Sequence, residues 1–336
     1  MKVYSDIDGL GFSTMRKLML NEATEHGLAV LEQGADRLRI KSDYGAFGII
    51  DRSANGFRLE IEADGAGNLH VLRDSLVAHI TDFQPDVAAQ IAWSDAVQDG
   101  LRPPNFQFAK VKAATRLSAS FQRLTLVLSK PDSFGDRAIH FRFVLPRPDN
   151  PAPEWPTLAA NGSTRWPEGD KALHRPVYTV RAQRQAEIDV DVFLHEGGQA
   201  SEWAVGVAAG TSVALIGPGG GGVLDTARVV LAGDETAYPA ISRIIESLPG
   251  QTRGKVILLS HAKQQDYPVP HHVGLTPAWV GPDDFVRAVS SAASDCMGGY
   301  VWAAADAGQI NALRNCDEIA HHPKAQRYVA TYWKRT

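Results

Sequence analysis

The sequence predicts a multidomain protein with a small α+β domain, an antiparallel β-barrel and an α/β domain built on a parallel sheet. The 336 residues, 44% of them hydrophobic, suffice for two or three separate cores. Up to about residue 225, apolar and polar residues alternate as in half-exposed strands, whereas later strands are continuously apolar and separated by helices. We therefore predict domains over residues 1–95, 106–225 and 226–336.

The first domain begins with a predicted helix over Ser13–His26. Strand-like alternation follows at Arg37–Lys41 and Gly56–Glu62, with Gly- and Asn-containing breaks between the strands. The run Leu69–Ile80 is typical of a helix that covers such a sheet. Two adjacent prolines in Gln98–Asn105 fit poorly inside a helix or central strand, so we interpret this stretch as a linker.

The second and third domains differ in rhythm. The barrel strands are predicted at Phe121–Leu128, Ile139–Leu145, Val177–Arg181, Ile188–Leu194 and Ser212–Ile216, with one helix at Ala200–Val207. The parallel sheet is predicted from strands at Arg228–Ala232, Lys255–Ser260 and Tyr300–Trp302, with helices at Thr236–Leu248 and Ala307–Arg314. The glycine run Gly217–Gly222 matches no phosphate-loop pattern, so we interpret it as a flexible turn between domains.

The charge balance excludes some partners. Lys and Arg total 34 against 38 Asp and Glu, so no excess positive charge is available for nucleic acid or an anionic membrane. The N-terminal residues lack a secretory pattern, and no window approaches 18 apolar residues. We expect a cytoplasmic protein without membrane insertion, and a monomer is compatible with these observations.

Neither thiols nor histidines predict a resident metal site. Cys296 and Cys316 are too few for a disulfide framework or a cysteine-ligated cluster. The pairs His271–His272 and His321–His322 are adjacent residues that point in different directions, without an acidic partner at helical spacing. Redox chemistry would therefore require a bound organic cofactor or an external metal, and no side chain is assigned as acid, base or nucleophile.

The segment Gly233–Ala237 lies where a predicted parallel strand ends and a helix begins, which is where ligands collect in such sheets. Gly233 would permit a tight turn and close approach of a cofactor, and Asp234 or Thr236 would cap the helix. An ordinary strand-to-helix turn explains the same residues equally well.

Two upstream segments carry residues suited to a flavin nucleotide. In Arg175–Arg181, an aromatic ring, a hydroxyl and two guanidinium groups lie on one extended stretch, although a core tyrosine with solvated arginines fits as well. In His195–Trp203, a glycine-rich turn opens a helix and offers N–H groups to a pyrophosphate, and an ordinary connection is the alternative.

Taken together, these motifs resemble the siderophore-interacting protein family of FAD-binding ferric reductases. The resemblance rests on R-x-x-Y-T-V-R, H-x-G-G-x-A-S-x-W, G-D-E-T-A-x-P-A, a late strand with Trp302 and a terminal Tyr332-Trp333-Lys334. It covers Phe106 to the C-terminus, and it implies a barrel and nicotinamide domain like those of ferredoxin-NADP reductases. Residues 1–95 resemble a separate domain of unknown function that accompanies some of these reductases.

The family implies a role for each matching residue. Arg175 would hold phosphate, and Tyr178, Thr179, Val180 and Arg181 would contact FAD near its flavin end. The phosphate and adenine side of FAD would be bordered by His195, Ala200, Ser201 and Trp203. The NAD(P)H site would be bordered by Gly233, Asp234, Glu235, Thr236 and Ala237. Lys334 would attract an anionic ferric-siderophore.

Two departures from the family pattern stand out. The first arginine of the flavin motif usually lies two residues before the tyrosine, where this chain has Pro176. The late strand usually ends in Gly-Glu, where this chain has Ala305-Asp306.

The expected activity is FAD-dependent reduction of a ferric-siderophore by NAD(P)H, in service of iron acquisition. The alternatives are an oxidoreductase with another acceptor and a non-catalytic siderophore-binding module. Ser260–Lys263 contains no carboxylate that would choose NADH, and Lys263 could meet the 2'-phosphate of NADPH.

Overall fold

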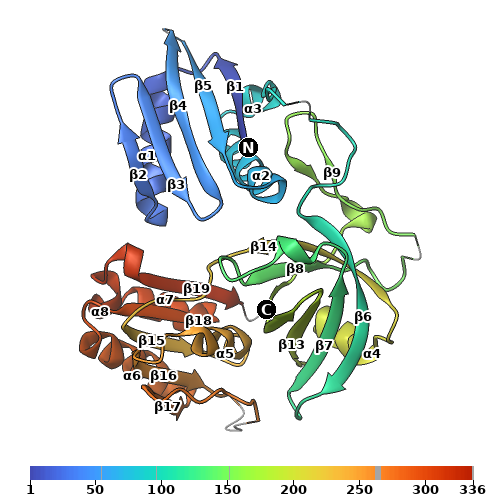
Figure 1. Cartoon of the computed structure of the whole chain (residues 1–336), viewed down its shortest axis with the longest axis vertical. Coiled ribbons are helices and arrows are strands. Elements are labelled where there is room, and N and C mark those ends of the chain that lie inside the picture. Colours follow the sequence, from blue (N-terminus) through green and yellow to red (C-terminus); the bar gives the residue numbers. More distant parts are fainter. Residues whose placement is uncertain (54, 96, 151, 262–265, 335–336) are drawn as a thin grey trace. The chain divides into compact units, whose positions relative to one another are not determined.

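The structure is a computed structural model that describes residues 1–53, 55–95, 97–150, 152–261 and 266–334. By internal contacts, the chain falls into two compact units (Figure 1). The first unit contains Met1–Gln107 and Val144–His174, and the second contains Phe108–Phe143 and Arg175–Thr336.

The first unit is built on an antiparallel sheet of five strands in the order β1-β5-β4-β3-β2. Its elements are β1 Lys2–Asp8, α1 Phe12–His26, β2 Ala29–Gln33, β3 Arg37–Ser42, β4 Gly45–Ser53, β5 Gly56–Glu62, α2 Ala66–Phe83 and α3 Pro85–Ala89. Alternate residues of β1, β3 and β5 are buried, and they share one apolar core with α1 and α2. The helices therefore cover one face of this sheet (Figure 1).

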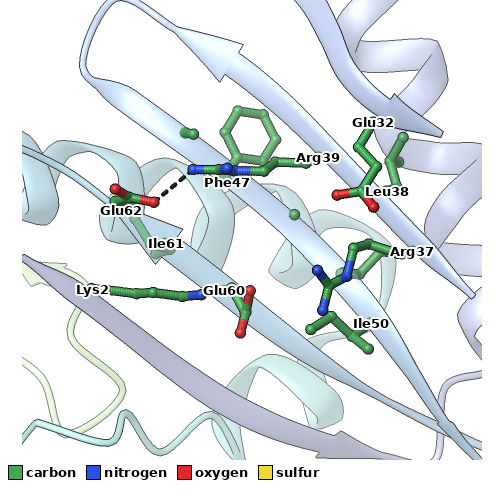
Figure 2. Close-up of a pocket in the computed structure, with 13 residues that line it drawn as sticks. Lys2, Glu32, Arg37, Leu38, Arg39, Phe47, Ile50, Glu60, Ile61 and Glu62 are labelled. Carbon is green, nitrogen blue, oxygen red and sulfur yellow. Dashed lines mark hydrogen bonds and ion pairs between the residues drawn. The ribbon is translucent and has the colours of Figure 1, made fainter. Parts of the chain in front are cut away.

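The opposite face of this sheet carries charged side chains in a shallow hollow (Figure 2). Arg39 donates to the Glu62 carboxylate at 2.6 Å, and the Lys2 ammonium lies 3.2 Å from a Glu60 oxygen. Charges of opposite sign on neighbouring strands are the usual arrangement on a solvated sheet face. Surface ion pairs therefore account for the charged side chains that line this hollow.

The segment 144–174 makes its contacts in the first unit. It contains the short hairpin β9 Thr157–Leu158 and β10 Thr164–Arg165. Trp93 donates its indole N–H to the Asn161 carbonyl at 2.8 Å, and Thr164 donates its backbone N–H to the Asp74 carboxylate at 2.6 Å. The Arg73 guanidinium lies 5.0 Å from the Trp93 ring centre.

The barrel-like sheet has seven strands in the order β11-β8-β14-β6-β7-β13-β12. Its elements are β6 Phe106–Arg116, β7 Phe121–Leu128, β8 His140–Val144, β11 Val177–Thr179, β12 Ala182–Arg184, β13 Glu187–Phe193, α4 Gln199–Gly206 and β14 Ser212–Gly219. The segment after β11 links distant strands, because Val180 donates its N–H to Ile139 and Arg181 donates to Asp189 on β13. The sheet therefore curls toward closure.

The second unit holds this barrel-like sheet and also a parallel sheet, which has five strands in the order β17-β16-β15-β18-β19. Its elements are β15 Arg228–Gly233, α5 Tyr238–Ser247, β16 Arg253–Leu259, β17 Leu275–Val280, α6 Pro282–Asp295, β18 Tyr300–Asp306, α7 Ala307–Arg314, α8 Asp317–Ala320 and β19 Arg327–Trp333. One face packs on α5 and the other on α6, α7 and α8. The α5 side also contains Phe121 and Ile139, so barrel and parallel sheet share one core.

The predicted combination of an antiparallel barrel-like sheet with a parallel sheet is confirmed. One local interpretation is wrong: Gly217–Gly219 end strand β14 and are not a flexible turn. Close packing explains the glycines, since a Cβ on Gly220 would lie 2.6 Å from the His140 ring, and one on Gly222 would lie 2.3 Å from the Asp136 carbonyl oxygen. Among the described residues, no helix is both long and apolar enough to cross a bilayer.

Candidate functional site

Gly233 ends β15 at a point where the chain has no room for a side chain. A Cβ there would lie 2.6 Å from the Ala304 carbonyl oxygen and 2.5 Å from the Ala237 Cβ. Four residues of Gly233–Ala237 are buried, and Thr236 is half-buried. The glycine therefore allows β15, β18 and the start of α5 to approach closely at the carboxyl end of the parallel sheet.

The Asp234 carboxylate joins three strands of the parallel sheet. One oxygen accepts hydrogen bonds from the Thr236 N–H at 3.0 Å and the Thr236 hydroxyl at 2.6 Å. The other accepts from the Asp306 N–H at 2.9 Å and the Trp333 indole N–H at 2.7 Å. Burial raises the pKa of Asp234, while the bonds from Thr236 and Trp333 act in the opposite direction. Its side chain is therefore engaged within the protein.

Glu235 is likewise engaged, through His261 at the end of β16. The carboxylate accepts the His261 backbone N–H at 2.7 Å, and its second oxygen lies 2.8 Å from the His261 Nδ1. The predicted capping of α5 by Asp234 or Thr236 is wrong, because Ala237 occupies the N-cap position and no side chain caps the helix. Asp234 and Thr236 are instead joined by hydrogen bonds before the helix begins.

On the barrel, Tyr178 and Thr179 lie next to each other on β11 with different surroundings. The half-buried Tyr178 ring packs edge-on against Phe143, and burial raises its pKa to about 12. The buried Thr179 hydroxyl lies 3.2 Å from the Nδ1 of His140. A phenol on one face and a hydroxyl on the other follow from the alternation of a strand.

His140 connects the barrel to the last strand of the parallel sheet. Its Nε2 lies 3.1 Å from the Tyr332 hydroxyl, and its Nδ1 is bonded to Thr179. Burial, aided by the charge of Arg243, lowers the pKa of His140 to about 4. The imidazole is therefore neutral at physiological pH, so one ring nitrogen donates and the other accepts.

Arg181 and Arg243 tie helix α5 to the barrel. Arg181 donates to both Glu246 oxygens at 2.6 and 2.8 Å. Arg243 donates to the Val180 carbonyl at 2.6 Å and to the Asp136 carboxylate at 2.9 Å. Both guanidinium groups are largely buried, so they fix the barrel and the parallel sheet relative to each other within this unit.

Arg175 and Arg142 place two exposed positive groups close together at the edge of the barrel. Arg142 donates to the Arg175 carbonyl oxygen at 3.0 Å. Partial desolvation of this exposed residue, and secondarily the charge of Arg142, lowers the pKa of Arg175. A bound anion would offset the repulsion between the two positive guanidinium groups, so the pair suits a phosphate group.

The turn between β13 and α4 is closed by Ser201. Its hydroxyl donates to the Phe193 carbonyl at 3.2 Å and accepts the His195 N–H at 3.3 Å. A Cβ on Gly198 would lie 2.4 Å from the His195 ring, which explains the glycine. Trp203 is half-buried and packs against Phe143, which also contacts Tyr178.

The departure at Ala305-Asp306 has a structural explanation. The Asp306 carboxylate caps α7 by accepting the N–H groups of Gly308 at 2.8 Å and Gln309 at 3.3 Å. Ala305 is completely buried against the α6 and α7 side of the sheet. Both residues therefore serve the packing of β18 and α7.

The late aromatic residues form a wall beside this junction. Trp302 stacks on Tyr328 with ring centres 5.4 Å apart, and its ring meets Tyr332 edge-on at 6.1 Å. Lys334 follows this wall and is exposed. Lys263, which sequence reasoning offered for a 2'-phosphate, lies outside the described residues.

Several residues of the site were missed by sequence reasoning, namely His140, Arg142, Arg243, Glu246 and His261. The strand containing His140 and Arg142 was predicted, but only the register of β8 against β11 places them opposite Thr179 and Val177. Glu246 and Arg243 lie on a predicted helix, where charged residues usually face solvent.

In the second unit, an antiparallel barrel-like sheet meets the carboxyl end of a parallel sheet. The model of the siderophore-interacting FAD-binding domain matches residues 110–222, and that of the siderophore-interacting protein matches residues 226–336.

Ferric vibriobactin reductase ViuB of Vibrio cholerae is 31% identical, covering 50% of this chain and 69% of the relative. The NADPH-dependent ferric-chelate reductase of Escherichia coli is 27% identical, covering 68% and 92%. The crystal structure of the siderophore-interacting protein SipS from Aeromonas hydrophila aligns with a TM-score of 0.58 at 24% identity, covering 69% of this chain and 92% of that one. The chain therefore belongs to the siderophore-interacting protein family, and the predicted resemblance is confirmed.

Proposed function

We propose that this protein is an FAD-dependent reductase that uses NAD(P)H to reduce ferric-siderophore complexes and release Fe(II) for iron acquisition. The observation that carries the proposal is the direct hydrogen-bonded junction between barrel and parallel sheet, in a chain of this family. Relatives named for NADPH-dependent ferric-chelate and ferric vibriobactin reduction support the assignment.

Within this proposal, the second unit has the architecture of ferredoxin-NADP reductases. Residues 106–225 form the flavin barrel, apart from the segment 144–174, which belongs to the first unit, and residues 226–336 form the nicotinamide domain. Residues 1–95 form an accessory α+β domain. The monomeric state and the cytoplasmic location expected from the sequence belong to the same proposal.

The residues present fit FAD. Tyr178 and Trp203 are half-buried aromatic residues that share Phe143 as a neighbour, so their rings offer apolar surface to a planar group. The adjacent pair Arg175 and Arg142 offers guanidinium donors to a pyrophosphate. When bound, FAD supplies the transfer of electrons from a hydride donor to ferric iron.

The chain's own residues position the cofactor and shield it. Thr179 would donate to or accept from the flavin edge while His140 fixes its hydroxyl. Arg181 is already paired with Glu246, so it would act on the flavin end by holding β11 in place. The turn containing His195, Ala200 and Ser201 would present its backbone to the phosphate and adenine side.

The nicotinamide would lie against the carboxyl end of β15. Because Asp234 and Glu235 are engaged within the protein, direct contact would fall to the half-buried Thr236, whose hydroxyl donates to Asp234 and can still accept a hydrogen bond. Gly233 and Ala237 would border the cofactor's site, since the Ala237 N–H already donates to the Asp234 carbonyl. Lys334, exposed after the aromatic wall, would attract an anionic iron complex. No side chain needs to act as an acid or base.

The test is anaerobic spectroscopy of the purified full-length protein loaded with FAD. We expect flavin absorbance that bleaches on addition of NADPH or NADH and returns when a ferric-siderophore is added, with Fe(II) captured by a chromogenic chelator. The proposal is wrong if FAD does not bind, or if the bound flavin transfers electrons to no ferric chelate. Transfer to quinones alone would identify a different acceptor.

Variants at the arginine pair locate the phosphate contact. R175A and R142A should each weaken FAD binding by about tenfold, as expected for the loss of a charge-assisted contact of about 1.4 kcal/mol. R287A is the matched control, because within the described part of the chain that exposed arginine is paired with Asp284 on the same helix, α6. Equal FAD affinity in all three variants would remove the pair from the site.

A further inference from the structure

One carboxylate and two imidazoles gather between the two long helices of the first unit. Glu22 and His26 lie one turn apart on α1, and His79 comes from α2. A Glu22 oxygen lies 3.3 Å from the Nε2 of His26 and 3.3 Å from the Nε2 of His79. All three candidate ligand atoms lie within 4.8 Å of one another.

These separations match those of a metal site. Zinc binds imidazole nitrogen and carboxylate oxygen at about 2.0–2.2 Å, so two ligand atoms at a tetrahedral angle lie on the order of 3.3 Å apart. The two nitrogen-to-oxygen distances already have this value. Both histidine rings are exposed, so they can rotate to complete the set.

The orientation of His79 supplies an independent indication. Its Nδ1 lies 2.7 Å from the Ser75 carbonyl oxygen, which can only accept a hydrogen bond. The Nδ1 therefore carries the proton in the neutral ring, and the Nε2 that faces Glu22 keeps its lone pair. Metal-binding histidines commonly have their other nitrogen held in this way.

The three residues also border a cavity of about 590 Å³ between α1 and α2. Apolar side chains such as Met15, Met19 and Leu76 contribute to its lining. An apolar surrounding lowers the local dielectric and strengthens the attraction between a carboxylate and a cation. The cluster is thus placed beside an apolar space, unlike the ion pairs on the outer face of the sheet.

We propose that Glu22, His26 and His79 bind one divalent first-row transition-metal ion, with solvent completing its coordination. Two imidazoles and one carboxylate suit Zn(II) or Fe(II). The expectation of no resident metal site rested on the adjacent histidine pairs. Spacing along the chain does not reveal this cluster, because the third ligand comes from a different helix.

The test uses untagged full-length protein stripped of metal with a chelator, since a polyhistidine tag would bind the same ions. Zn(II) binding is measured by competition with a chromogenic chelator, and Co(II) is added to report coordination by its visible absorption. An anaerobic Fe(II) titration distinguishes the two candidate ions. We expect one equivalent of Zn(II) to bind, with affinity reduced at least tenfold in E22Q, H26Q and H79Q.

The control is H321Q. His321 is exposed on the protein surface, and its Nδ1 lies 2.8 Å from the carbonyl four residues earlier, the same local arrangement as at His79. This variant should bind Zn(II) as the original protein does. Unchanged Zn(II) affinity in H79Q, or no binding by the original protein, would overturn the proposal and leave a simple carboxylate-imidazole contact. Thermal unfolding without metal verifies that each variant is folded.

Discussion

Replacing Asp234 by asparagine tests whether its carboxylate is the junction of the parallel sheet. The structure gives it four donors, two on each oxygen, and an amide can accept from only one side. If the NH₂ group faces the β18 and β19 donors, two buried N–H groups lose their acceptor. If it faces Thr236, the hydroxyl can turn to accept and one N–H is orphaned.

The second orientation is less costly and sets the expected magnitude. One orphaned buried donor costs about 1–3 kcal/mol. Removing a buried charge offsets some of the loss from weaker neutral hydrogen bonds. We therefore expect D234N to lower the free energy of unfolding by about 1–3 kcal/mol, and the melting temperature by about 2–4 °C per kcal/mol.

The assay is urea and thermal unfolding of D234N and the original protein without cofactors, followed by tryptophan fluorescence. D284N is the matched control, because that carboxylate is exposed on α6. It should change stability by less than about 0.5 kcal/mol. Equal stability of D234N and D284N would refute the assignment of Asp234 as a junction.

Four further predictions follow from the same unit. G233A should lose about 1–3 kcal/mol of stability and raise the KM for NAD(P)H, measured by unfolding and steady-state kinetics, because the added methyl would lie 2.6 Å from a carbonyl oxygen. His140 takes its proton near pH 4 when folded and near pH 6.5 when unfolded, so its contribution is complete above pH 6.5 and is lost as the pH falls towards 4. Between pH 6.5 and pH 4, the free energy of unfolding of the original protein should therefore fall by up to about 3 kcal/mol more than that of H140Q, which lacks the imidazole. Urea midpoints measured at several pH values check this. E246Q should lower the stability of the apoprotein by no more than about 1 kcal/mol in the same unfolding assay, because Glu246 is partly exposed. K334E should raise the KM for anionic ferric chelates several-fold without changing that for neutral ones, in parallel kinetic assays.

Regular elements with strong periodicity were predicted well from the sequence. The strand Gly56–Glu62 and the helix Ala307–Arg314 have the predicted bounds. Strand β19 was not predicted as a strand, because all its residues are only partly buried and give no alternation. Strand β17 was missed for a similar reason, since it is mostly exposed. Edge strands lack the burial that produces a pattern.

The site was predicted as a set of segments, but its internal bonds were not. The donors to Asp234 come from β18 and β19, and only the parallel register brings Asp306 and Trp333 to it. The pairing of Arg181 with Glu246 likewise requires α5 to pack against the barrel. Spacing along the chain contains no information about these contacts.

The engagement of Asp234 and Glu235 changes what the Gly233–Ala237 motif can do. Both carboxylates hold neighbouring strands, so among the side chains of the motif a nicotinamide cofactor would meet mainly Thr236. Repulsion between these acids and the cofactor's phosphates is reduced, because N–H donors already surround them. Loss of either carboxylate should therefore affect the binding of NAD(P)H through the shape of the strand end. The stability of the protein and its KM for NAD(P)H should then change together. T236S keeps the hydroxyl that donates to Asp234 and removes only the methyl, so it should change KM with little loss of stability, and this difference separates architecture from direct contact.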